Sequence, residues 1–131
     1  MTNRNTDPTE HPRKAAEAVR AFNHATLPAL NGRPGIEYTG TAYHAIGAFT
    51  TLAHRLPQSF HQIAMALAEL HKDGHLTADH GTPTEHAAVT CAALREAEQH
   101  ASALAKALER AHSTCSPLGY GGPLDDTDDD L

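Results

Sequence analysis

Two rows of apolar residues dominate the pattern of the chain, and each repeats with alternating spacings of three and four residues. The first row runs from residue 46 to 70 and the second from residue 87 to 118. A three-four spacing places all members on one stripe of an α-helix, so each row predicts a long helix with one apolar face. The first row is Ile46, Phe49, Ala53, Leu56, Phe60, Ile63, Leu67 and Leu70. The second row is Ala87, Thr90, Leu94, Ala97, Ala101, Leu104, Leu108, Ala111, Cys115 and Leu118.

Capping residues mark the ends of the predicted helices. Asp7 and Thr82 are each followed directly by a proline and, three residues on, by a glutamate, which is the signature of a helix start. Gly74 is placed to end the middle helix. Pro57 lies inside that helix, and it predicts a kink because the row continues in phase across it. The predicted helices span residues 8–27, 41–73 and 83–116.

A short polar loop between the two rows predicts an antiparallel hairpin. With the loop centred near Ala78, facing residues have numbers that add to about 157, which pairs Phe60 with Ala97 and Ala53 with Leu104. Large residues then mostly meet small ones, so the two faces interdigitate. The residues expected at the core or interface are Ile46, Phe49, Leu56, Phe60, Ile63, Leu67, Leu94, Leu104 and Leu108.

The predicted fold class is therefore all-α: a long, coiled-coil-like hairpin with a shorter helix before it. Residues 8–116 form one helical domain, and residues 1–7 and 117–131 are expected to be disordered, the latter as a Pro/Gly-rich and acidic tail. A bare hairpin would leave flanking residues such as Leu52, Met65 and Val89 in water. Either a three-helix monomer or a dimeric bundle would cover them, and we favour the homodimer.

Charge and composition narrow the classes of partner. The net charge is −6, and the sequence contains no lysine and arginine cluster of the kind that neutralises phosphates, which argues against nucleic acid. There is no apolar run long enough for a membrane span and no apolar signal segment, so the expected location is the cytoplasm. Cys91 and Cys115 lie 24 residues apart in one predicted helix, about 36 Å, so they cannot pair and are expected to be reduced.

Eleven histidines open one alternative. The hairpin tip gathers residue types that bind zinc and other divalent metals, although it has no HExxH or CxxC spacing. The candidate metal ligands are His71, His75, Asp79, His80 and His86. A second alternative is a nucleic-acid-associated regulator that would use the basic residues of the first segment. These residues are Arg4, Arg13, Lys14, Arg20 and Arg33.

Catalytic motifs are missing from the sequence. Its serines lie in no nucleophile elbow, and the glycines after residue 118 follow a helix, whereas a phosphate-binding loop follows a strand and precedes a helix. We therefore expect no enzyme activity and no cofactor. The leading hypothesis is a helical protein that binds other protein, including copies of itself, in a regulatory or mobile-element complex.

The hairpin of about 100 residues resembles the WXG100 proteins in shape, although its turn, HLTADHGTPTEH, lacks their Trp-x-Gly. The composition, rich in alanine, threonine, histidine and glycine and poor in lysine, is similar to that of proteins from high-GC actinobacteria. Small helical proteins of unknown function are common there, including on plasmids and phage-derived elements. This resemblance implies an actinobacterial, all-helical protein and names no activity.

Overall fold

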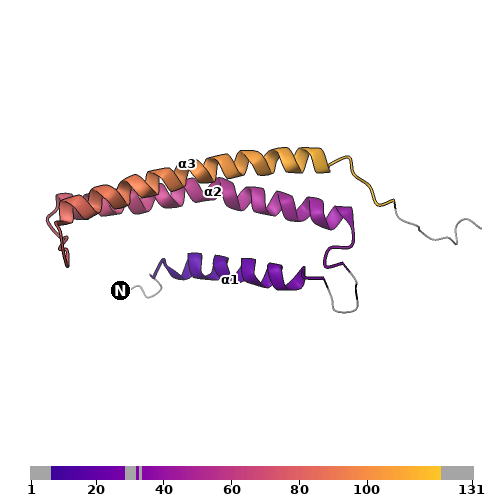
Figure 1. The fold of residues 1–131 in the computed structure, drawn as a ribbon, viewed down its shortest axis with the longest axis horizontal. Coiled ribbons are helices and arrows are strands. Elements are labelled where there is room, and N and C mark those ends of the chain that lie inside the picture. Colours follow the sequence, from indigo (N-terminus) through magenta and orange to yellow (C-terminus); the bar gives the residue numbers. More distant parts are fainter. Residues whose placement is uncertain (1–6, 29–31, 33, 122–131) are drawn as a thin grey trace, which may run out of the picture.

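The computed structural model is built from three helices (Figure 1). The structure describes residues 7–28, 32 and 34–121, and this part contains no strand. The helices are α1 (Glu10–Ala25), α2 (Thr39–Lys72) and α3 (Pro83–Cys115). Each begins and ends within two residues of its predicted position, so the all-α architecture is confirmed. Of the segments predicted to be disordered, residues 1–6 and 122–131 lie outside the described residues. In the described parts, Asp7 is bonded by the Thr9 amide and the Tyr120 ring lies 5.5 Å from the Tyr38 ring.

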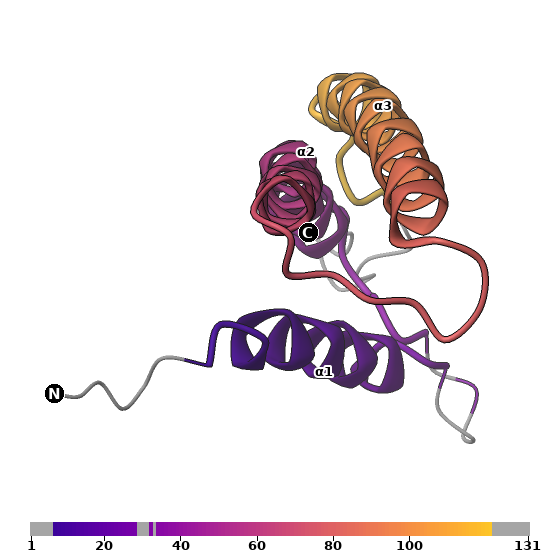
Figure 2. The same ribbon diagram turned by 90° about the vertical axis from the view of Figure 1, so that its left-hand side faces the viewer.

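Helices α2 and α3 form the antiparallel hairpin, lying side by side along their whole length (Figures 1 and 2). Side-chain contacts define their register. Near the tip the Cys91 thiol donates to the Ala64 carbonyl at 3.6 Å. At the open end the His112 ring stacks on Tyr43, with ring centroids 4.1 Å apart. Both contacts lie within one helical turn of the register expected from the sequence, so that register is supported.

The hairpin tip is closed by the two capping devices that the sequence predicts. Gly74 adopts φ +77°, which an L side chain rarely does, and the His75 amide donates to the Leu70 carbonyl at 2.9 Å. Across the loop, the Thr82 hydroxyl accepts a hydrogen bond from the Glu85 amide at 3.1 Å, with Pro83 at the first helical position. These local bonds satisfy backbone groups that the helix ends would otherwise leave unpaired.

Replacing Thr82 with alanine is expected to lower the free energy of unfolding by about 1 kcal/mol, because the Glu85 amide loses its acceptor. Urea denaturation followed by far-ultraviolet circular dichroism measures the change. Thr90→Ala is the matched control, since Thr90 is exposed within α3 and does not cap the helix. Equal losses in the two variants would contradict a capping role for Thr82.

The start of α1 uses a different arrangement. The Asp7 carboxylate accepts hydrogen bonds from the Thr9 hydroxyl at 2.6 Å and from the Thr9 amide at 3.0 Å. The chain enters the helix directly afterwards, at Glu10. The N-cap residue is Thr9, whose own side chain makes no capping bond, so the helix starts two residues later than the predicted cap at Asp7, and Asp7 instead binds the residue that precedes the helix.

Both hydrogen bonds favour the ionised carboxylate, the hydroxyl more strongly, so the pKa of Asp7 lies below its ordinary value of 3.8. A lowered pKa in the folded state means that this contribution to stability is present above pH 3.8 and is lost as the pH falls through the folded pKa. Carbon-13 NMR titration of the carboxyl measures the pKa. In Thr9→Ala, we expect it to move back toward 3.8. An unchanged pKa in that variant would contradict the assignment.

The core of the hairpin is made of small residues. Four alanines are buried, Ala53 completely so, and no large side chain in the described part is fully buried. Alanine lets two helix axes approach closely, toward the lower end of the usual 8–10 Å. The buried alanines are Ala53 and Ala64 of α2 and Ala101 and Ala105 of α3.

The contact line between the helices, which we call the seam, is displaced from the predicted row. The seam and the predicted row share every second position of α2, namely Ile46, Ala53, Phe60 and Leu67. Between them, the seam uses Tyr43, Thr50, Pro57, Ala64 and His71, all buried or half-buried. The predicted row has Phe49, Leu56, Ile63 and Leu70 at the alternate positions, one residue before the seam.

Ile63 and Leu104 are the clearest corrections. We expected both to face across the hairpin, but they are 49% and 48% exposed. A three-four pattern with apolar or small residues at neighbouring positions is compatible with two adjacent seams, and close alanine packing favours the one used here. The remaining predicted core residues are half-buried: Ile46, Phe49, Leu56, Phe60, Leu67, Leu94 and Leu108.

Pro57 lies within α2, which continues through it as one helix from Thr39 to Lys72. The expectation that the helix continues past proline is therefore confirmed, and the kink at Pro57 stays a prediction. The two cysteines are free thiols, as the spacing predicts. Over the described residues, none of the helices is both long and apolar enough to cross a membrane.

Candidate interaction surface

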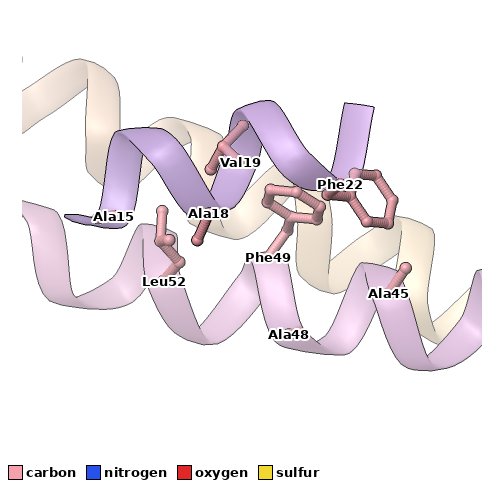
Figure 3. Close-up of a pocket in the computed structure, with 8 residues that line it drawn as sticks. All are labelled: Ala15, Ala18, Val19, Phe22, Ala45, Ala48, Phe49 and Leu52. Carbon is pink, nitrogen blue, oxygen red and sulfur yellow. The ribbon is translucent and has the colours of Figure 1, made fainter. Parts of the chain in front are cut away.

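Helix α1 packs against α2 on a side that α3 does not cover (Figure 2). Two rows, one on each helix and with the same spacing of three, four and seven residues, line the gap between α1 and α2. Phe22 meets Phe49 edge-on, with ring centroids 5.1 Å apart. The row on α1 is Ala15, Ala18, Val19 and Phe22, and the row on α2 is Ala45, Ala48, Phe49 and Leu52 (Figure 3).

The fit between these two rows is loose. An apolar gap of about 240 Å³ remains between them, lined only by alanine, valine, phenylalanine and leucine side chains. Helix α1 has no buried residue, and only Val19 and Phe22 within it are half-buried. This side of α2 therefore accepts an antiparallel helix through small and large apolar side chains, without polar contacts in the groove.

The same side of α2 continues beyond α1 without a cover. Figure 1 shows the hairpin tip extending well past the first turn of α1. Eighteen residues make five turns of an α-helix, so a residue 18 positions further on points in the same direction. The α1-docking row of α2 therefore repeats toward the tip. We call this repeat the tip row: Ile63, Ala66, Leu67 and Leu70.

The tip row is apolar and largely open to water. Ile63 is 49% and Leu70 is 43% exposed, Ala66 is exposed and Leu67 is half-buried. In an antiparallel helix pair, residues one position before a seam residue lie on the same face in both helices. Ile63 is such a residue in α2, and Ala97 and Leu104 are such residues in α3, so all three lie on this face. None of these six side chains carries a charge. Exposed apolar residues that gather on one face are typical of a protein-binding surface.

The opposite face of the hairpin is polar. His61 lies 3.4 Å from the Glu98 carboxylate, and His54 pairs with Glu109, each contact joining α2 to α3. Met65 is the exception there, with 57% of its surface exposed. Met65 and Ile63 are the sequence neighbours of the seam residue Ala64, so their side chains lie on opposite faces of the hairpin.

The histidine-rich tip brings two of its candidate metal ligands together, since the rings of His80 and His86 meet edge-on with centroids 4.9 Å apart. His71 is 3.3 Å from the Thr84 hydroxyl, and a ring nitrogen of His86 is 2.8 Å from the His80 carbonyl. His75 and Asp79 are exposed. Within residues 7–28, 32 and 34–121, no three histidine, cysteine or carboxylate side chains are close enough to hold a metal ion. The metal alternative therefore gains no support from this arrangement and stays a prediction.

The sequence pattern did not lead us to the row of α2 on which α1 lies, nor to the repeat of that row at the tip. The signal was present, because Ala45, Ala48, Phe49 and Leu52 have apolar counterparts 18 residues later. It was hidden because Phe49 was assigned to the contact between the long helices, and because Leu67 borders both that contact and the tip row.

The chain matches no family model, and no curated protein or solved structure is significantly similar to it. A function therefore has to be inferred from the chemistry of the surface itself.

Proposed function

We propose that this protein is a non-enzymatic helical interaction protein, and that the face of the tip row is its binding surface. The observation that carries the proposal is the tip row itself. It is an uncharged row of apolar, largely exposed side chains, and it lies on the same side of α2 as the row that faces α1. A partner would cover it with an apolar helix face, in the way that amphipathic helices fill hydrophobic grooves.

The small core supports the same proposal. Each buried alanine removes only one methyl side chain from water. Burial of one such aliphatic carbon stabilises the folded state by about 0.8 kcal/mol. The larger side chains Ile63, Leu70 and Leu104 keep nearly half of their surface exposed. Covering them would bury more apolar area per residue than the hairpin does by itself, so association would stabilise the fold.

The place and setting belong to the proposal as well. The half-buried free thiols Cys91 and Cys115 suit a reducing compartment, so we propose the cytoplasm. Regulatory and mobile-element complexes are the settings in which a small adaptor without catalytic groups would act. Sedimentation of cell extracts would test whether the native chain travels in a complex larger than its own 14.0 kDa.

The proposal is tested by comparing two aspartate variants for association in cell extract. Ile63→Asp introduces a charge into the tip row, and Met65→Asp introduces the same charge on the opposite face at similar exposure. Quantitative crosslinking in extract, read by mass spectrometry, gives the amount of each protein joined to the chain. We expect Ile63→Asp alone to lose those partners. Equal crosslinking in the wild type and both variants would contradict the proposal.

A further inference from the structure

We propose that α1 is an autoinhibitory lid on α2. It leaves α2 as a unit while the hairpin of α2 and α3 stays folded, and its release joins the row beneath it to the tip row. The row beneath α1, which we call the lid row, is Ala45, Ala48, Phe49 and Leu52. The inhibitory role rests on the proposed function, whereas the opening of the lid does not.

Helix α1 stands further from the hairpin than the two long helices stand from one another. Closely packed helices have axes 8–10 Å apart, and α2 and α3 bury four alanines between them. The structure describes every residue of the three helices, and no Cα atom of α1 lies within 8 Å of a Cα atom of α2 or α3. Space of about 240 Å³ remains between α1 and the lid row (Figure 3). Side chains of α1 therefore reach α2 across a gap and do not interdigitate with it along the helix.

Polar bonds do not hold α1 to the hairpin. Its ion pairs among the described residues join neighbours within α1 itself, Lys14 to Glu10 at 3.9 Å and Arg20 to Glu17 at 3.4 Å. The groove between α1 and α2 is lined only by apolar side chains. Apolar contact is therefore what keeps α1 in place.

That apolar contact is small. Helix α1 has no buried residue, and only Val19 and Phe22 within it are half-buried. Segments with few buried apolar contacts open at a lower free energy than the whole fold. Isolated helices of about 12–15 residues are marginal in water, and α1 has 16 residues, so it loses its helical structure when it leaves α2. The buried alanines of the hairpin all belong to α2 and α3, so they are retained.

Release of α1 uncovers a long apolar strip on α2. The lid row precedes the tip row by 18 residues, or five helical turns, so both lie on the same side. The half-buried residues Leu56 and Phe60 lie between them. With α1 closed, the tip row offers about 11 Å of helix axis, whereas the strip from Ala45 to Leu70 offers about 38 Å. A partner with an apolar helix face therefore competes with α1 for most of its binding length.

Amide hydrogen exchange of the full chain, measured by NMR for each residue, tests the opening of the lid. We expect amides between Ala18 and Phe22 to have protection factors at least about 100-fold lower than those of Ala53 and Ala101. Phe22→Ala should lower the protection of α1 by a further factor of about 10 and leave the seam unchanged. Arg13→Ala, an exposed position on the far side of α1, should change neither.

The contrary result is equally clear. Equal protection in α1 and in the seam, falling together in Phe22→Ala, would show that the three helices unfold as one unit and would overturn the lid.

Distances between spin labels test whether α1 leaves its place. In a cysteine-free background, Ala21→Cys and Thr51→Cys place labels at exposed positions of α1 and α2. We expect a narrow distance distribution in the otherwise unchanged chain and a broad, longer one when Phe22→Asp is added. The pair Thr51→Cys and Ser113→Cys, which spans the hairpin, should keep its distance in both. A narrow distribution between α1 and α2 that survives Phe22→Asp would overturn the proposal.

Crosslinking in cell extract separates the lid from the proposed function. Because only the open form offers the whole strip, Phe22→Asp should raise the amount of crosslinked partner about 10-fold or more. If Phe22→Asp left that amount unchanged while Ile63→Asp abolished it, the inhibitory role would be overturned and the proposed surface would stand. If Ile63→Asp left it unchanged, the proposed function would fail, and the exchange and distance measurements would still decide whether the lid opens.

Discussion

Replacing Ala53 with leucine is expected to lower the free energy of unfolding by about 1–3 kcal/mol. Ala53 has no exposed surface and lies in the seam between α2 and α3. Three further carbon atoms cannot fit there unless the helices move apart, and such a movement would loosen the contacts of Ala101 and Ala105 as well. Urea denaturation of the two proteins measures the loss.

Ala92→Leu is the control for this experiment. Ala92 is exposed on α3, so the same added volume meets water there, and the expected change is within about 0.5 kcal/mol. If Ala53→Leu stabilised the protein or matched Ala92→Leu, the alanine seam would not be the core of the hairpin.

Replacing Pro57 with alanine is expected to raise the free energy of unfolding by about 1–2 kcal/mol. Proline inside a helix costs about 3 kcal/mol relative to alanine, because it removes the bond to the carbonyl four residues earlier and its ring clashes there. In this chain that carbonyl belongs to Ala53. The gain is reduced because the Pro57 ring is half-buried beside Glu98 and Ser102, and that contact would be lost.

Pro83→Ala is the control for Pro57→Ala, because the same substitution at Pro83 is not expected to raise the free energy of unfolding. Pro83 occupies the first position of α3, where a backbone N–H would have no helical partner, so proline costs nothing there. We expect its replacement to leave stability unchanged or slightly lower, as judged by thermal unfolding. A gain in Pro83→Ala as large as in Pro57→Ala would contradict this account of α2.

The helix ends were predictable because their causes are local. Thr82 and the glycine at position 74 act on backbone groups within a few residues, and the structure contains both devices. The continuation of α2 past Pro57 was predictable too, since the apolar pattern on either side stays in phase. The register near the tip followed from the short loop, which leaves little freedom to slide one helix along the other.

The rotation of the long helices about their axes was not predictable in the same way. Ile63 and Ala64 are neighbours, and either can face α3 while the three-four spacing is kept. The structure buries Ala64 and leaves Ile63 half exposed. This choice depends on how closely the backbones approach and on where α1 docks, which involve residues far apart in the chain.

The sequence by itself determined that this protein is an all-helical chain with a long hairpin, because helix periodicity, caps and loop length are encoded over short stretches. Only the tertiary structure decided which side of each helix became the core. Packing of small residues brought the alanines together, and helix α1 covered one apolar row of α2. The repeat of that row at Ile63, Ala66, Leu67 and Leu70 then stayed on the surface, because α1 is too short to cover both.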